Sequence, residues 1–191
     1  SASMLDSTLV NIIRTRNMDD DRKRNAEKWQ RAVKTVDWIS TQLPITSRYQ
    51  IWNFSDELSS ALPGMDDIWL EVADRDQLND AIQYVEELIP ANGTNLEQVF
   101  AAVRNLNPMP DNIFLITDGL PTLNGRNTRD TLITPRDRME LFEDAVEELP
   151  EGIPVNIILM PLEGDPSAAA AYWQLAQYTQ GSFLTPSKDW P

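Results

Sequence analysis

Three short stretches of the sequence carry oxygen-bearing side chains that could form one site: Ser1 and Ser3, Thr94, and Thr117 with Asp118. Asp118 directly follows an apolar run, Ile113 to Ile116, which is typical of a strand buried on both faces of a parallel sheet. In open α/β sheets, ligands bind at this carboxyl end of the strands. If the other two stretches reach the same edge, their hydroxyls and the single carboxylate could hold a hard cation, with positions left for water or a partner's carboxylate. Because Asp and Gly are common turn residues, Asp118 and Gly119 are equally compatible with a simple turn.

The composition narrows the chemistry that such a site could perform. The 191 residues include no histidine and no cysteine, which excludes thiolate nucleophiles, Ser-His-Asp triads and zinc sites built from nitrogen or sulfur ligands. A metal ion would therefore need oxygen ligands, which suit Mg²⁺, Mn²⁺ or Ca²⁺. The formal net charge of −14 disfavours nucleic acid and anionic lipid as partners. No apolar run is long enough to cross a membrane.

Two functions of different classes are compatible with these residues. One is a protein-binding module that uses a cation, and the other is a metal-assisted phosphohydrolase, because Asp118 ends a strand beside Thr117. We favour the binding module and expect no enzymatic activity, since the sequence has no histidine and no glycine-rich phosphate loop. Carboxylates alone can still perform acid–base catalysis, so the enzyme stays as the alternative.

Alternating helices and strands would position these residues. Periodicity predicts helices over about 22–42, 76–88, 95–106, 139–149 and 168–180, and strands over about 49–54, 68–72, 113–116, 155–160 and 182–185. Asp76 is the expected N-cap of the second helix and Gly181 the expected C-cap of the last. Leu9 to Ile13 should form a short helical turn packed against the body. The alternation predicts an α/β protein with a mainly parallel sheet and helices on both faces.

Several motifs together resemble those of a von Willebrand factor type A domain, over essentially the whole chain. Ser1-Ala2-Ser3-Met4 resembles the end of that family's Asp-x-Ser-x-Ser motif, and Gly93-Thr94-Asn95-Leu96 resembles its threonine loop. The segment 114–122 resembles its aspartate loop, 51–56 its second strand, and 175–183 its last helix and strand. The resemblance implies a single domain over residues 1–191 with a three-layer, Rossmann-like α/β fold and one antiparallel edge strand at residues 68–72.

The resemblance also implies a metal-ion-dependent adhesion site, with Ser1, Ser3, Thr94 and Asp118 at the matching ligand positions. Such a site holds Mg²⁺ (or Mn²⁺ or Ca²⁺) and binds an acidic side chain of a protein partner through the metal. The family's motif begins with an aspartate two residues before Ser1, and its central strand precedes that aspartate. We therefore expect both to lie upstream of residue 1, and residues 1–191 to fold poorly without them. A structural domain with a decayed metal site is the alternative.

Two further expectations concern the surroundings of the site. Arg126, Arg129, Arg136 and Arg138 lie in or near the loop at 120–135 and could help to hold an acidic partner segment, although ordinary solvated arginines explain them as well. The plain helix–strand layout resembles bacterial type A domains more than integrin domains. Such proteins are often exported or anchored in a membrane by an upstream segment. We therefore expect a location in the bacterial cell envelope or elsewhere outside the cytoplasm, with the cytoplasm as the alternative, and no membrane contact from this segment itself.

Overall fold

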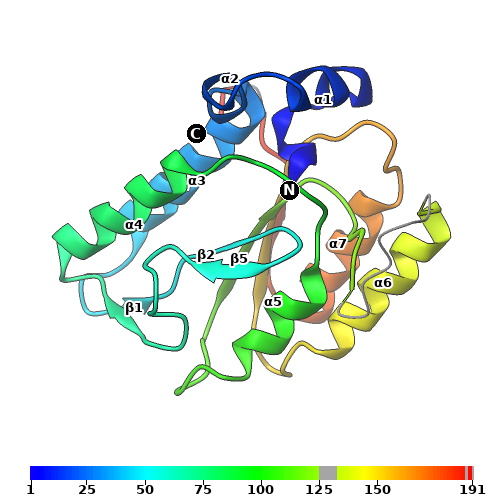
Figure 1. The fold of residues 1–191 in the computed structure, drawn as a ribbon. Helices are drawn as coiled ribbons and strands as arrows, with labels where there is room; N and C mark the ends of the chain where they lie inside the picture. The colour runs from blue at the N-terminus through cyan, green and yellow to red at the C-terminus, as the bar shows by residue number, and fades with distance from the viewer. Residues whose placement is uncertain (125–132, 188, 191) are drawn as a thin grey trace.

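A parallel sheet of three strands forms the centre of the structure, a computed structural model that describes residues 1–124, 133–187 and 189–190. The strands are β5 (Ile113–Thr117), β6 (Val155–Leu159) and β7 (Phe183–Leu184), in the order β5-β6-β7. Ile113 pairs with Val155 and Thr117 with Leu159. The carboxyl ends of β5 and β6 therefore lie side by side, at the end of the sheet where the N-terminal segment sits in Figure 1.

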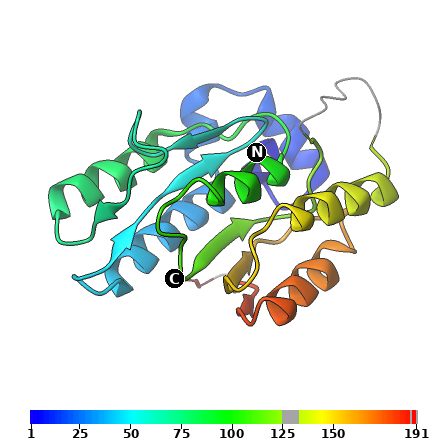
Figure 2. The same cartoon turned by 90° about the horizontal axis from the view of Figure 1, so that it is seen from below.

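Helices cover both faces of this sheet. On one face Leu115, Ile157 and Leu159 form a continuous core with α5 (Leu96–Val103), α6 (Pro135–Glu147) and α7 (Ala168–Tyr178). On the other face Ile116 and Ile158 pack against α3 (Glu27–Gln42). Figure 2 shows α3 and α4 (Arg75–Glu87) on one side of the molecule and α5, α6 and α7 on the other. The alternation of apolar residues along β5 and β6 accounts for both packed faces.

The remaining strands are short and antiparallel. The pair β1 (Arg48–Tyr49) and β4 (Leu70–Glu71) is one ladder, and β2 (Trp52–Phe54) with β3 (Leu58–Ser60) is a second. The expected strand at 49–54 is therefore divided in two, and the expected edge strand at 68–72 is antiparallel but contains only two residues. The mainly parallel single sheet is corrected to three separate sheets among the described residues, of which only β5-β6-β7 is parallel.

A cavity of about 680 Å³ separates β2 from β5. It is lined by α3, β1, β2 and β5, and Ser1, Thr94 and Asp118 stand among its lining residues. No described strand pairs with the free edge of β5, and Phe114 on this strand is 49% exposed. The expectation of a strand buried on both faces is therefore wrong for Phe114, because β5 is an edge strand that borders the cavity.

The N-terminal segment contains more helix than expected. It consists of a 3₁₀ turn at Ala2–Leu5, α1 (Leu9–Arg16) and α2 (Asp20–Arg24). The expected helix over 22–42 is interrupted at Asn25 and Ala26, so that α2 and α3 are separate. Leu9, Val10 and Ile13 are exposed, so the expected helix is present but does not bury these residues.

Two helix ends also differ from expectation. Asp74 rather than Asp76 caps α4, because its side chain accepts the backbone N–H of Gln77. After α7 the residue with left-handed backbone is Gln180, with φ of 59°. Gly181 is required for a different reason: a Cβ there would lie 2.0 Å from the carbonyl oxygen of Val155. This glycine lets the chain pass close to β6 before β7 begins.

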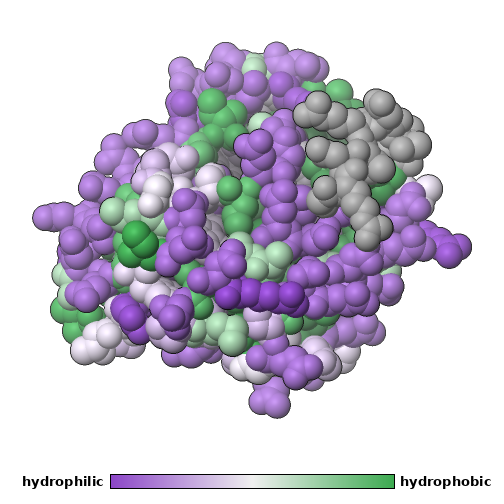
Figure 3. Space-filling view, turned by 60° about the horizontal axis from the view of Figure 1, so that its bottom comes forward, coloured by the Kyte–Doolittle hydropathy of each residue, from purple (hydrophilic) through white to green (hydrophobic). Residues whose placement is uncertain are grey.

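Polar side chains cover most of the surface that Figure 3 shows. The face shown in Figure 3 is mainly hydrophilic, with hydrophobic side chains in several separate places. Within the part of the chain that the structure describes, no helix is both long and apolar enough to cross a membrane.

Candidate cation site at the carboxyl end of β5

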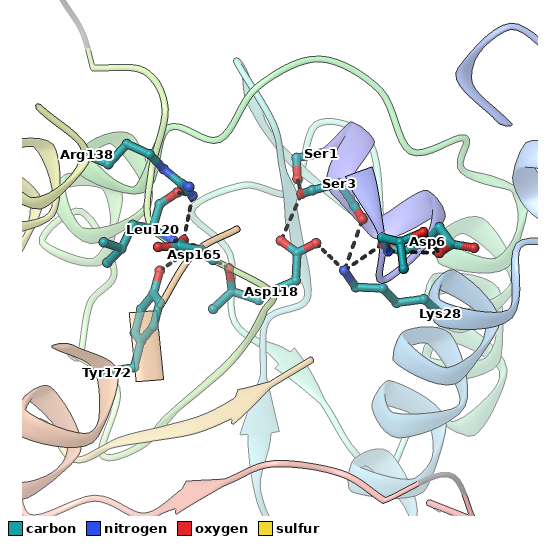
Figure 4. Close-up of polar contacts among 12 residues, drawn as sticks. Ser1, Ser3, Asp6, Lys28, Asp118, Leu120, Arg138, Asp165 and Tyr172 are labelled. Carbon is teal, nitrogen blue, oxygen red and sulfur yellow. Dashed lines mark hydrogen bonds and ion pairs between the residues drawn. The ribbon is translucent and has the colours of Figure 1, made fainter. Parts of the chain in front are cut away.

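Asp118 is the centre of a buried polar cluster that forms where β5 ends (Figure 4). The hydroxyl of Ser3 donates to Asp118 Oδ1 at 2.8 Å. Ser1 Oγ and Ser3 Oγ are hydrogen-bonded to each other at 2.7 Å. The structure therefore brings together three of the four predicted ligand residues, from segments 115 positions apart in the chain.

Lys28, from the first turn of α3, holds the second oxygen of the carboxylate. Its Nζ lies 2.7 Å from Asp118 Oδ2, and the two side chains are only 3% and 4% exposed. The same ammonium donates to the carbonyl oxygens of Ser3 at 3.0 Å and Asp6 at 3.1 Å. All three donor hydrogens of Lys28 therefore have an acceptor. Burial lowers the pKa of Lys28 below its ordinary value, while the negative charges of Asp118 and Asp6 act in the opposite direction.

Thr94 reaches the same region through its backbone. Its N–H donates to Thr122 Oγ1 at 2.9 Å, and its carbonyl oxygen accepts the N–H of Thr122 at 2.9 Å. Nearby, the N–H of Ala2 donates to the carbonyl oxygen of Asn92 at 3.0 Å. These contacts join the threonine loop to the segment after Asp118 and to the N-terminal turn. Thr94 is buried and lines the same cavity as Ser1 and Asp118.

The local sequence explains why the threonine loop sits so close. Asn95 rather than Thr94 caps α5, since its side chain accepts the N–H of Gln98 at 3.2 Å. That leaves the Thr94 side chain free of a capping role. A Cβ on Gly93 would lie 2.7 Å from a side-chain carbon of Leu123. Glycine at this position therefore permits the close approach of the two loops.

A second ion pair fixes the backbone just beyond Asp118. Asp165 Oδ2 accepts the N–H of Leu120 at 2.7 Å and lies 2.7 Å from Arg138 Nη2. The hydroxyl of Tyr172 donates to the carbonyl oxygen of Gly119 at 3.0 Å. Burial raises the pKa of Tyr172, so the phenol stays protonated and remains a donor. Asp118 is thus presented by a loop whose next two residues are held from the other side.

Lys28, Asp165 and Arg138 were not predicted as site residues. Lys28 shares a buried stripe with Ala32 and Thr35, at the four- and three-residue steps of one helix face. Because this stripe contains a lysine and a threonine, it does not form an apolar pattern, and the sequence did not mark Lys28 as buried. Asp165 lies on a loop after β6, where no periodicity marks it.

Of the four arginines expected in or near the loop at 120–135, Arg136 and Arg138 lie among the described residues, and both are ion-paired within the chain. Arg136 is exposed and pairs with Glu140 at 3.0 Å on its own helix. Arg138 points inward and also donates to the carbonyl oxygen of Leu120. Arg126 and Arg129 lie outside the described residues.

The side chains around Asp118 offer the type of donor atom that a hard cation binds. Ser1, Ser3 and Asp118 supply two hydroxyls and one carboxylate, the oxygen donors that Mg²⁺ prefers. Three oxygens beside Asp118 already surround a positive charge, because the carbonyl oxygens of Ser3 and Asp6 and one carboxylate oxygen of Asp118 all contact the ammonium of Lys28. Among the described residues no group of three or more acidic, histidine or cysteine side chains could hold a metal. A metal would therefore be held by one carboxylate together with neutral oxygens.

Comparison with solved structures gives the fold. The chain matches the structure "von Willebrand factor type A from Catenulispora acidiphila" with a TM-score of 0.61 and 14% sequence identity. The match covers 88% of this chain and 36% of that one. The sequence matches no protein-family model and no curated protein. The chain thus has a von Willebrand factor type A-like fold, as its motifs predicted.

Proposed function

We propose that this chain is a protein-binding module that binds an acidic side chain of its partner through Mg²⁺ at the carboxyl end of β5. The observation that carries the proposal is the hydrogen-bonded series Ser1–Ser3–Asp118, with links of 2.7 and 2.8 Å. Hydroxyls and a carboxylate gathered at this edge of an α/β sheet are suited to a hard cation. The von Willebrand factor type A-like fold supports the same reading.

Within this proposal each residue has a separate task. Asp118 supplies the one negative charge, Ser1 and Ser3 supply hydroxyl oxygens, and Thr94 supplies a third hydroxyl from the neighbouring loop. Asp165 and Tyr172 position the site, because they hold the backbone at Leu120 and Gly119. The bound metal would supply a positive centre with open coordination positions for the partner's carboxylate.

The charge of the protein gives a reason for a metal at the contact. With a net charge of −14, the body of the protein repels an acidic partner. The two cationic side chains described beside the site's loop, Arg136 and Arg138, are paired with Glu140 and Asp165. A bound dication would provide the local attraction that these arginines do not. We also propose that the role is non-enzymatic and is carried out at the bacterial cell envelope.

The test measures unfolding of the protein during titration with Mg²⁺. If only the folded state assembles the site, Mg²⁺ at about 100 times its Kd should stabilise the protein by about 2.7 kcal/mol. EDTA should reverse the effect. Thr94→Val, which replaces the hydroxyl with a methyl group of similar size, and Asp118→Asn should each abolish it. Asp111→Asn is the matched control, because this exposed carboxylate lies just before the same strand. No Mg²⁺-dependent shift, or a full shift in Asp118→Asn, would contradict the proposal.

A structural domain with a decayed metal site is the second candidate, and the Lys28–Asp118 ion pair favours it. An ammonium that already satisfies the carboxylate can stabilise the fold without any metal. On this alternative the protein unfolds cooperatively, and Mg²⁺ affects neither its stability nor its affinity for any acidic peptide.

A further inference from the structure

Lys28 is a cation already bound to the carboxylate that would hold the metal. Its ammonium lies 2.7 Å from Oδ2, while the other carboxylate oxygen accepts the Ser3 hydroxyl. Asp118 therefore has one oxygen in the predicted ligand cluster and one on a cation that belongs to the protein. The carbonyls of Ser3 and Asp6 complete the surroundings of this ammonium.

The charges make this arrangement competitive with a metal. Asp118 and Lys28 together carry no net charge, so a dication that approaches the pair gains little from the carboxylate. If both cations shared Asp118, they would repel each other in a water-poor site, where charges interact more strongly than in bulk water. The metal is favoured only when the ammonium moves away from the carboxylate.

The burial of Lys28 excludes a direct contact between its ammonium and the partner's carboxylate. With 3% of its side chain exposed, its ammonium cannot reach the carboxylate of a partner at the surface. It is also fully used by three acceptors that belong to this chain. Lys28 therefore does not replace the metal as the group that contacts the partner.

We propose that Lys28 is a built-in competitor of the metal: its ammonium closes the metal-free site on Asp118, and Mg²⁺ binds only as this ion pair opens. The inference rests on the proposed function and adds its regulation. The site then has two states, one neutral and closed by Lys28, and one loaded with metal and able to attract an acidic partner. Loss of the Lys28 charge should favour the second state.

Isothermal titration with Mg²⁺ and with Mn²⁺ tests this in the folded chain. Lys28→Met keeps much of the side-chain volume and removes the charge. Without repulsion between the ammonium and the metal, the metal affinity should rise roughly tenfold or more, which is the size of the change that a neighbouring like charge makes in a proton-binding equilibrium. Lys34→Met is the matched control, because it removes the same charge from an exposed position on the same helix and should leave the affinity unchanged. Equal affinity in Lys28→Met and the unsubstituted protein would overturn the inference and leave the proposed function standing. Absence of metal binding in every variant would overturn the proposed function, and the inference with it.

A second measurement avoids the substitution, which leaves Asp118 without its partner and could impair folding. In protein with ¹⁵N-labelled lysine side chains, the buried ammonium of Lys28 should give a protected NMR signal in the absence of metal. Saturation with Mg²⁺ should shift or remove this signal while those of exposed lysines stay in place. A Lys28 signal that stays unchanged at saturating Mg²⁺ would overturn the inference.

Discussion

The loop after β5 is held by two ion pairs that differ in what they fix. On the cavity side, Lys28 pairs with the side chain of Asp118, and both are almost fully buried, at 3% and 4% exposure. On the core side, Arg138 pairs with Asp165, with 17% of the arginine side chain exposed, and Asp165 also accepts the N–H of Leu120. The second pair fixes the backbone, whereas the first engages the side chain that would bind a ligand.

The two sides also differ in packing, and the largest expected effect follows from that difference. The core side is a continuous apolar cluster, whereas the cavity side leaves one edge of β5 without a strand partner among the described residues. The Nε1 atoms of Trp29 and Trp52, two residues that line the cavity, are buried without a hydrogen-bond partner in the described part of the chain. A segment placed between β2 and β5 could satisfy such groups.

We therefore predict that an added β-strand stabilises the protein strongly. An N-terminal extension of about ten residues, long enough for a strand and its turn, should raise the free energy of unfolding by about 5 kcal/mol. That figure corresponds to about five new backbone hydrogen bonds at about 1 kcal/mol each. Urea denaturation measures it. An extension of equal length with proline at alternate positions is the control, because it cannot pair as a strand. Equal stability of the two extended proteins would show that the cavity does not accept a strand.

Removal of the Asp118 carboxylate should cause the next largest change in the free energy of unfolding. Asp118→Ala leaves the Lys28 ammonium buried and unpaired, which should cost about 3–5 kcal/mol of unfolding free energy. Because Asp118 lies in a loop, its sequence position alone suggests that the metal-free fold would tolerate this substitution; its burial in the structure indicates the opposite. Urea denaturation in EDTA gives the measurement, with Asp111→Ala as the exposed control.

A double substitution then separates the lost ion pair from other effects of Asp118→Ala. Lys28→Met combined with Asp118→Leu removes both charges and should recover most of the lost stability, as buried pairs replaced by apolar residues commonly do. A loss below about 1 kcal/mol in Asp118→Ala would show that the two charges are better solvated than their burial indicates.

The sequence predicted the parallel strands and most helices because their apolar residues recur with a clear period. β6 and α5 lie within the expected segments, and β5 and α4 each extend one residue beyond theirs. Of the four antiparallel strands among the described residues, β1, β2 and β4 overlap the expected strands at 49–54 and 68–72. The three-residue β3 was missed because it is too short to show a periodicity. Short strands take their conformation from their neighbours in space, and a single sequence does not contain that information.

The candidate site was predictable only in part, for a related reason. Ser3 and Asp118 were predicted together, because each belongs to a recognisable motif, and they are hydrogen-bonded in the structure. Lys28 belongs to no motif, and its contact with Asp118 spans 90 residues. Whether metal binds to the predicted ligands stays a prediction.

The core-side ion pair should matter less for stability. Asp165→Asn keeps an oxygen that can accept the N–H of Leu120 and removes the charge opposite Arg138, so it should cost about 1–2 kcal/mol. The side chain of Arg138 is 17% exposed, compared with 3% for Lys28, so water reaches the unpaired charge more easily and limits the loss. Glu140→Gln, which removes the exposed partner of Arg136, should cost less than about 0.5 kcal/mol. If Asp165→Asn costs as much as Asp118→Ala under urea denaturation, the distinction between the two ion pairs is wrong.

A small effect is also expected at Asp56, which lies in the loop after β2. The side-chain amide of Asn92 donates to Asp56 Oδ1 at 2.8 Å and, with the Ser55 hydroxyl, lowers the pKa of this carboxyl below its ordinary value. Between the folded and unfolded pKa values the unfolded chain binds more protons. The stabilisation is therefore fully present above the unfolded value of about 3.8 and is lost as the pH falls through the folded value.

Asn92→Gly isolates this effect, because Asn92 has a positive φ of 59° and glycine adopts that conformation without strain. The substitution should raise the pKa of Asp56, measurable by NMR titration of its carboxyl carbon. It should also reduce stability by about 0.5 kcal/mol near neutral pH, a value kept small by solvent screening. The added backbone freedom of glycine acts equally at all pH values. The difference between the stability losses near neutral pH and below the folded pKa therefore reports the hydrogen bond alone. A loss that is the same at both pH values would show that Asn92 does not stabilise the charged form of Asp56.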